Sequence, residues 1–111
     1  METSISQFGA WNILAIDGEF VVKYLSAIRQ HLDSFMSTPN PFIAFDLSKA
    51  SYIDSSAITL MLNFQKRIEA AAGRIVIFGA TEDARAIFSI VGLDASITLY
   101  DTREEFEKAV A

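Results

Sequence analysis

The sequence predicts an α/β domain, with a largely parallel sheet of four to five strands packed with about four α-helices. Short apolar runs typical of strands alternate with longer segments in which apolar residues recur every three or four positions, as on one face of a helix. The chain has 111 residues, of which 51% are hydrophobic. This is enough to bury one core and too little for two, so we expect a single domain over residues 1–111.

The central strand is expected at Phe42–Leu47, six residues with a single charge near their end. Such an apolar strand is typical of a position covered by helices on both faces. A short loop then leads to Asp54, Ser55 and Ser56, at the start of a helical pattern from Ser55 to Ala72. The first backbone N–H groups of a helix have no partner within it, so Asp54 is expected to act as the N-cap. The segment is therefore a strand-to-helix corner that presents a serine.

Two strands and a helix are expected before the central strand. Ile5–Phe8 is a candidate edge strand, and Trp11–Ile16 is its antiparallel partner. From Glu19 to Phe35 the apolar residues follow the spacing of one helical face. His31, the only histidine, lies at the border of that face. We interpret it as a half-buried residue placed favourably near the end of the helix.

The elements after the second helix follow the same alternation. Gly73 ends the helix, and Ile75–Phe78 is a second interior strand. A short helix is expected from Glu82 to Val91, and Ile97–Tyr100 is a candidate edge strand. The buried residues of the helix from Glu82 to Val91 are expected to be Ala84, Ile87, Phe88 and Val91.

The last helix is predicted by its start signal. Thr102, with Glu105 three positions later, has the form of a capping box, in which each side chain satisfies a backbone donor of the other residue. We therefore expect a last helix that begins after Thr102 and ends at Val110.

Charge and composition exclude several classes of protein. The net charge of −5 disfavours binding to nucleic acid or to an anionic membrane, both of which require a basic surface. There is no cysteine, hence no disulfide framework and no thiol nucleophile. The N-terminus has no signal-peptide pattern, and no apolar run approaches the ~20 residues of a membrane span. We expect a cytoplasmic protein without membrane insertion, whose partner is another protein.

The corner resembles a known family signature. Asp46-Leu47-Ser48, followed by Tyr52-Ile53-Asp54-Ser55-Ser56-Ala57-Ile58, is similar to the signature of STAS domains, and specifically of the anti-sigma factor antagonists of bacterial partner-switching systems. The resemblance continues through Leu14–Phe20, Arg74–Gly79 and residues 86–106, so it covers nearly the whole chain. It implies a single STAS domain, with a mixed sheet that begins as a hairpin.

The resemblance also implies a function and a site. In that family an anti-sigma factor that is also a serine kinase binds the unphosphorylated antagonist and releases it after phosphorylating the serine that follows the aspartate, here Ser55. A phosphatase resets the switch. The chain would need no cofactor and no metal of its own, because ATP and Mg²⁺ belong to the kinase. Ser56 is a secondary acceptor, and the expected partner interface comprises Val21, Val22, Asp46, Asp54, Ser56 and Ile58.

Three positions depart from the family pattern. Ala57 stands where the family commonly has glycine and Thr59 where a second small residue often follows, and a helix tolerates both. The Gly-Glu-apolar turn is often followed by an aspartate near the phosphorylated serine, and here that place holds Val21, with Val22 next to it. Val22 is expected to be exposed and to replace a polar contact with an apolar one. The alternative function is a STAS subunit of a transporter or signalling assembly that works without phosphorylation.

Two other chemistries fit the same corner less well. A serine nucleophile of an α/β-hydrolase would have glycine two positions to either side, where this chain has Ile53 and Ala57. A receiver domain phosphorylated on Asp46 would need an acidic pair to hold Mg²⁺, but Asp17 is followed by Gly18. Both comparisons favour a binding module over an enzyme.

Overall fold

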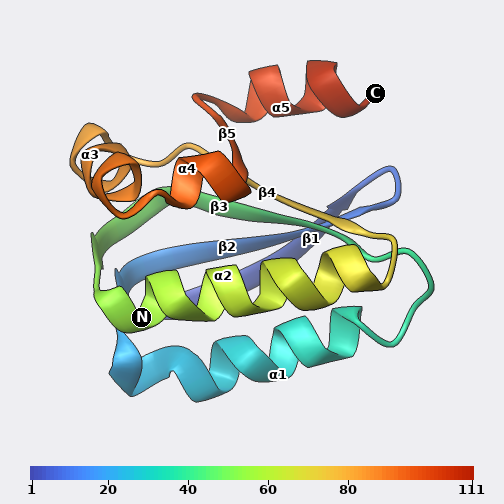
Figure 1. Cartoon of the computed structure of the whole chain (residues 1–111), viewed down its shortest axis with the longest axis horizontal. Helices are drawn as coiled ribbons and strands as arrows, with labels where there is room; N and C mark the ends of the chain where they lie inside the picture. The colour runs from blue at the N-terminus through green and yellow to red at the C-terminus, as the bar shows by residue number, and fades with distance from the viewer.

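A computed structural model describes the whole chain, residues 1–111. Five strands form one sheet in the order β1-β2-β3-β4-β5 (Figure 1). β1 pairs antiparallel with β2, and all other neighbours are parallel. The predicted α/β class, the hairpin at the start and the mixed, largely parallel sheet are therefore confirmed. The strands are β1 Glu2–Phe8, β2 Trp11–Phe20, β3 Phe42–Ile53, β4 Arg74–Phe78 and β5 Thr98–Tyr100.

Five α-helices and one short 3₁₀-helix connect or follow these strands. None of them is long and apolar enough to cross a bilayer. The helices are η1 Val22–Tyr24, α1 Leu25–Phe35, α2 Ser55–Ala70, α3 Glu82–Val91, α4 Leu93–Ser96 and α5 Arg103–Val110.

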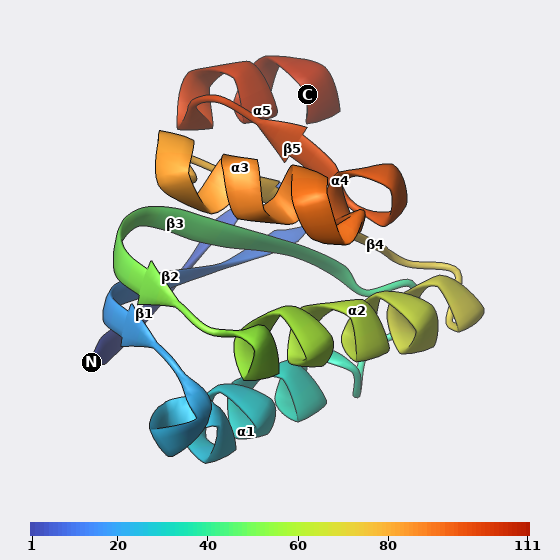
Figure 2. The same cartoon turned by 60° about the vertical axis from the view of Figure 1, so that its left-hand side comes forward.

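The helices bury both faces of the sheet, but unequally (Figures 1 and 2). On one face, α1 to α4 contribute to a core of 24 buried residues that includes Phe45 and Phe64. On the other face α5 packs alone, with the Phe106 ring stacked on Phe78 at 5.1 Å and edge-on to Trp11 at 5.3 Å between ring centroids. Because α5 has only eight residues, part of this second face, over β1 to β3, is left as a polar hollow.

β3 is longer than expected. A loop was expected between Leu47 and Asp54, whereas the strand continues to Ile53 beside an equally extended β2. The pairing of β2 and β3 contains two register shifts. Such bulges break the alternation of inward and outward residues, which explains why the sequence pattern concealed the strand. Because β2 runs to Phe20, the first helical turn begins at Val22, not at the predicted Glu19.

α3 buries less of its apolar surface than its sequence predicts. Ala84 and Phe88 are buried as expected, but Ile87 and Val91 are 40% and 50% exposed. The helix lies at the margin of the molecule in Figure 1, so only a narrow face of it meets the core. After Gly92, the chain turns into α4, a short helix that was not predicted and that buries Leu93.

The end of α2 and the start of α5 are fixed by specific contacts. A Cβ atom on Gly73 would lie 1.9 Å from the carbonyl oxygen of Pro41, so glycine is required where the two loops touch. The Thr102 hydroxyl accepts from the Glu105 N–H at 3.1 Å, as predicted. The Glu105 carboxylate, however, accepts from the N–H of Asp101, one residue before the position that a capping box requires.

Candidate functional site

The corner between β3 and α2 is organised by the carboxylate of Asp54. As the N-cap of α2, it accepts through Oδ1 from the N–H of Ala57 at 3.0 Å. Its other oxygen, Oδ2, accepts from the N–H of Val22, also at 3.0 Å. One side chain thus satisfies a free donor of the helix and ties the β3–α2 corner to a turn 32 positions earlier in the chain.

A backbone contact reinforces this link. The N–H of Asp54 donates to the carbonyl of Phe20 at 3.2 Å, where β2 and β3 end side by side (Figure 2). The turn that follows β2 is therefore held next to the start of α2. Val21 is half-buried there, whereas Val22 is 65% exposed, as the sequence predicts.

The two serines differ in accessibility. Ser55 is exposed at the first position of α2, and Ser56 is half-buried. Ile58 is only 7% exposed, so it belongs to the core more than to the surface. The serines and Val22 border a shallow hollow of about 260 Å³, which is also lined by Leu25, Arg29, Thr59 and Leu60.

Arg29 is a member of this site that the sequence did not reveal. It is exposed on α1, it is the only charged residue that lines the hollow, and it takes part in none of the ion pairs of the structure. A free guanidinium is a good partner for a phosphate group. The packing of α1 beside α2 therefore places a cation on the same hollow as Ser55.

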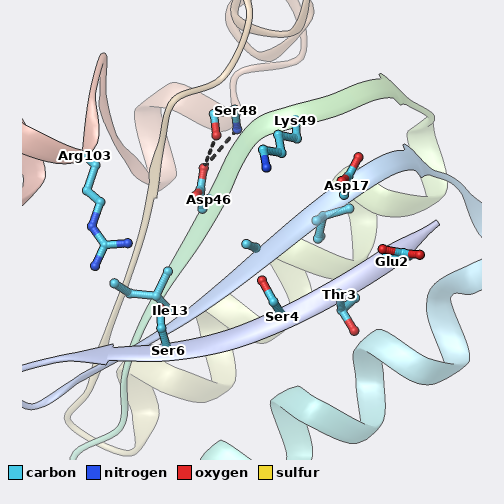
Figure 3. A pocket seen from close by; sticks show the side chains of 12 residues that line it. Glu2, Thr3, Ser4, Ser6, Ile13, Asp17, Asp46, Ser48, Lys49 and Arg103 are labelled. Atoms are coloured by element: carbon cyan, nitrogen blue, oxygen red, sulfur yellow. Dashed lines mark hydrogen bonds between the residues drawn. The ribbon is translucent and has the colours of Figure 1, made fainter.

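Asp46 lies in a different place from the other expected interface residues. Its Oδ1 accepts from the N–H and the hydroxyl of Ser48, at 3.0 and 2.7 Å (Figure 3). It lines a cavity of about 240 Å³ on the α5 face of the sheet, together with hydroxyl and charged side chains of β1 to β3 and Arg103 of α5. The hollow beside Ser55 does not include it. The structure therefore brings Val22, Asp54, Ser55 and Ser56 together and keeps Asp46 apart.

His31 is also directed elsewhere. Its Nε2 lies 3.3 Å from the hydroxyl of Thr3 on β1, and it is half-buried near the end of α1. It makes no hydrogen bond to Ser55, so the pair does not have the geometry of a nucleophile with its base. The chain gathers no group of three or more side chains that could hold a metal ion.

Comparisons with known proteins agree with this architecture. A search of curated proteins gave no match. An anti-sigma factor antagonist from Mycobacterium paratuberculosis superposes with a TM-score of 0.87 at 18% identity, over 98% of this chain and 92% of the other. The phosphorylated form of the Bacillus cell fate determinant SpoIIAA gives 0.73 at 19% identity, over 97% and 99%.

A transporter domain shares the same fold. The STAS domain of a SulP transporter from Vibrio cholerae superposes with a TM-score of 0.77 at 14% identity, over 94% of this chain and 83% of the other. At such identities these neighbours establish the fold alone. The family model for the STAS domain matches residues 5–106, nearly the full length of the chain, and the protein therefore belongs to the STAS domain family.

Proposed function

We propose that this STAS protein is an anti-sigma factor antagonist that binds an anti-sigma factor serine kinase when unphosphorylated and is released when the kinase phosphorylates Ser55. The observation that carries this proposal is the exposed position of Ser55 as the first residue of α2, beside the exposed Val22. Fold neighbours named as anti-sigma factor antagonists, one of them in a phosphorylated form, support it. The role of Ser55 is transferred from the family motif.

The environment of Ser55 suits a phosphate in the free protein. A phosphoserine carries a charge of about −1.5 to −2 at neutral pH. Ser55 lies at the positive start of α2, and Arg29 lines the hollow that Ser55 borders. The carboxylate of Asp54 opposes the phosphate, but it is already engaged by two backbone donors. We therefore expect phosphorylation to leave the fold intact.

A docked partner would experience the phosphate differently. Docking removes the water that screens the charge, and unit charges ~4 Å apart then interact by about 4 kcal/mol at an effective dielectric constant of 20, against about 1 in water. A surface fitted to a neutral serine and to the apolar Val22 would lose at least roughly tenfold in affinity, or about 1.4 kcal/mol. Ser56 is the secondary acceptor, and its partial burial makes it the poorer substrate.

The rest of the proposed cycle requires no chemistry from this chain. The kinase supplies ATP and Mg²⁺, and a phosphatase restores the serine. We propose no enzymatic activity for the protein itself, consistent with a histidine that contacts Thr3 and not Ser55. The proposed partner interface contains Val21, Val22, Asp54 and Ser56. Asp46 is left out because it lines a different cavity, and Ile58 because it is largely buried.

The test is a titration of purified anti-sigma factor kinases from the same genome with three forms of the protein. Unmodified protein and Ser55→Ala should bind with equal affinity, and Ser55→Ala should resist phosphorylation. Protein phosphorylated at Ser55 should bind at least about tenfold more weakly while its melting temperature, followed by circular dichroism, is unchanged. A phosphorylated form that binds as tightly as the unmodified one, or one that is unfolded, contradicts the mechanism.

The alternative is a STAS subunit that binds a transporter or a signalling assembly without phosphorylation. The superposition on a transporter STAS domain supports this alternative as much as the shared fold supports the anti-sigma factor antagonist. The genes beside the coding sequence distinguish the two. Genes for a serine kinase and a phosphatase support the antagonist, whereas genes for transporter subunits support the alternative.

A further inference from the structure

The polar cavity on the α5 face of the sheet is formed by three neighbouring strands and the start of α5 (Figure 3). Its floor follows the register of the sheet, since residues that pair across strands lie side by side. One row of the floor contains Glu2, Asp17 and Lys49, and the next row contains Ser4, Ala15 and Asp46. Ala15 has the smallest of these side chains and stands on the middle strand, so the floor is hollow at its centre.

A β-bulge in β3 brings two charged residues to the same face of the sheet. In a regular strand, Asp46 and Lys49 would point to opposite faces, because they are three positions apart. Here Asp46 pairs with Ala15 and Lys49 with Asp17, so β3 has one residue more than β2 between the two pairs. The extra residue reverses the alternation, and both side chains line the cavity. Bulges that redirect a side chain in this way are frequent beside binding sites.

Opposite charges lie at opposite ends of the cavity. Figure 3 shows Arg103 and Ser6 at one end and Glu2 and Asp17 at the other. Ser6 and Glu2 are four positions apart on β1, which corresponds to about 14 Å along the strand. Arg103 pairs with Glu107 through Nε alone, so the two terminal nitrogens of its guanidinium remain available to a ligand.

The acidic end of the cavity lacks a cation. Glu2 stands directly opposite Asp17 in the antiparallel pair of β1 and β2, an arrangement of like charges that destabilises a sheet. Neither carboxylate takes part in an ion pair, and Lys49 forms none either, although it is in register with Asp17. The lining of the cavity contains three carboxylates and two cations, so negative charge is in excess. A ligand with a net positive charge balances it.

We infer that this cavity binds a basic α-amino acid of the class of L-lysine and L-arginine. The carboxylate of the ligand pairs with the guanidinium of Arg103, whose planar fork matches a carboxylate. Its α-ammonium group pairs with Asp46, which engages Ser48 through Oδ1 and keeps Oδ2 for the ligand. The cation at the end of its side chain lies between Glu2 and Asp17.

The size and charges of the cavity select against other ligand classes. A volume of about 240 Å³ is below the ~300–1,000 Å³ of sites for drug-sized molecules, so it suits a single amino acid. A diamine without a carboxylate would leave Arg103 without a partner. An acidic amino acid would bring a second carboxylate to an end that already carries two. The inference does not rest on the proposed function, because Ser55 borders a different hollow.

The experiment titrates the ¹⁵N-labelled protein with L-lysine, L-arginine, cadaverine and L-norleucine, followed by NMR. Cadaverine is lysine without its carboxylate, and L-norleucine is lysine without its side-chain ammonium. The two basic amino acids should shift the amide resonances of Ser4, Ala15 and Asp46 in a saturable way. Cadaverine and L-norleucine should each bind at least about threefold more weakly than L-lysine, since each lacks one charge pair at a partly exposed site.

Protein variants test the two ends of the cavity separately. Asp17→Asn and Arg103→Gln should each weaken L-lysine binding by at least about threefold. Glu19→Gln is the matched control, because it removes one negative charge from β2 at an exposed residue that does not line the cavity, and it should leave the affinity unchanged. All three variants should melt like wild type, since the substituted side chains are exposed.

The outcomes decide the inference without touching the proposed function. The inference is overturned if neither amino acid gives saturable shifts. Binding of L-lysine that Asp17→Asn and Arg103→Gln leave unchanged would place the ligand elsewhere and would also overturn it. Cadaverine that binds as tightly as L-lysine would show that the site takes a simple cation, against the assigned role of Arg103. In each case, binding of the kinase and phosphorylation of Ser55 remain to be judged by their own titration.

Discussion

Replacing Asp54 by asparagine and by alanine separates its two structural roles. Asparagine is as good an N-cap as aspartate, so the bond to the Ala57 N–H survives in Asp54→Asn. Its second polar atom is a donor, however, and it would face the N–H of Val22, which now bonds to Oδ2. Asparagine therefore keeps the cap and loses the link to the turn, whereas alanine loses both.

The expected losses in the free energy of unfolding follow from these two hydrogen bonds. Loss of an N-cap costs about 1 kcal/mol. The bond to the exposed Val22 N–H contributes about 0.5–1 kcal/mol, because water replaces part of it. We expect Asp54→Asn to lose about 0.5–1 kcal/mol and Asp54→Ala about 1.5–2 kcal/mol, the latter lowering the melting temperature by roughly 6–10 °C.

Urea unfolding followed by circular dichroism measures the free energies, and amide hydrogen exchange by NMR resolves the two bonds. In Asp54→Asn the Val22 amide should lose protection while the Ala57 amide keeps it. Asp17→Asn is the control, because it makes the same chemical change at an exposed carboxylate that forms no hydrogen bond in the structure. An Asp54→Asn protein with wild-type stability and a protected Val22 amide would refute the bridging role.

Three further predictions concern the corner and its support. Val22→Asp should weaken kinase binding with little change in melting temperature, because the side chain is 65% exposed; equal calorimetric affinities would remove the turn from the interface. Incubation with generic esters or with ATP alone should yield no product above buffer, and turnover that disappears in both Ser55→Ala and His31→Ala would contradict the binding-module proposal. Gly73→Ala should destabilise the fold by about 1–3 kcal/mol in urea unfolding, since its Cβ would meet the Pro41 carbonyl oxygen at 1.9 Å; wild-type stability would show that the two loops can separate freely.

Most of the fold was predictable because its strands and helices have strong local signals. The apolar runs at β3 and β4 and the helical spacing in α2 identify their elements without knowledge of the tertiary structure. The end of β3 was not predictable, since its residues are paired through register shifts that depend on β2. The exposure of Ile87 and Val91 was also missed, because the sequence shows that a helix has an apolar face but not what covers it.

The site was predicted only as far as residues adjacent in sequence determine it. Asp54 as the cap and Ser55 as the exposed serine both follow from the start of a helix. Asp46 was expected to lie near Ser55 because the two belong to one motif, but it faces the other side of the sheet. In an extended strand, neighbouring residues point to opposite faces and eight residues span about 26 Å, so proximity in the motif does not bring the side chains together.

Arg29 alters the charge balance that the sequence suggests for the corner. If Asp54 were the only charged neighbour, a phosphate on Ser55 would be repelled by its carboxylate. For unit charges ~4 Å apart in water, this repulsion is about 1 kcal/mol. Arg29 lines the same hollow and carries the opposite charge, so it opposes that repulsion. Its position depends on α1 lying beside α2, which no local pattern specifies. If Ser55 is phosphorylated as we propose, we expect the free protein to tolerate the phosphate and its cost to fall on the complex, where a partner surface must displace the water around both charges.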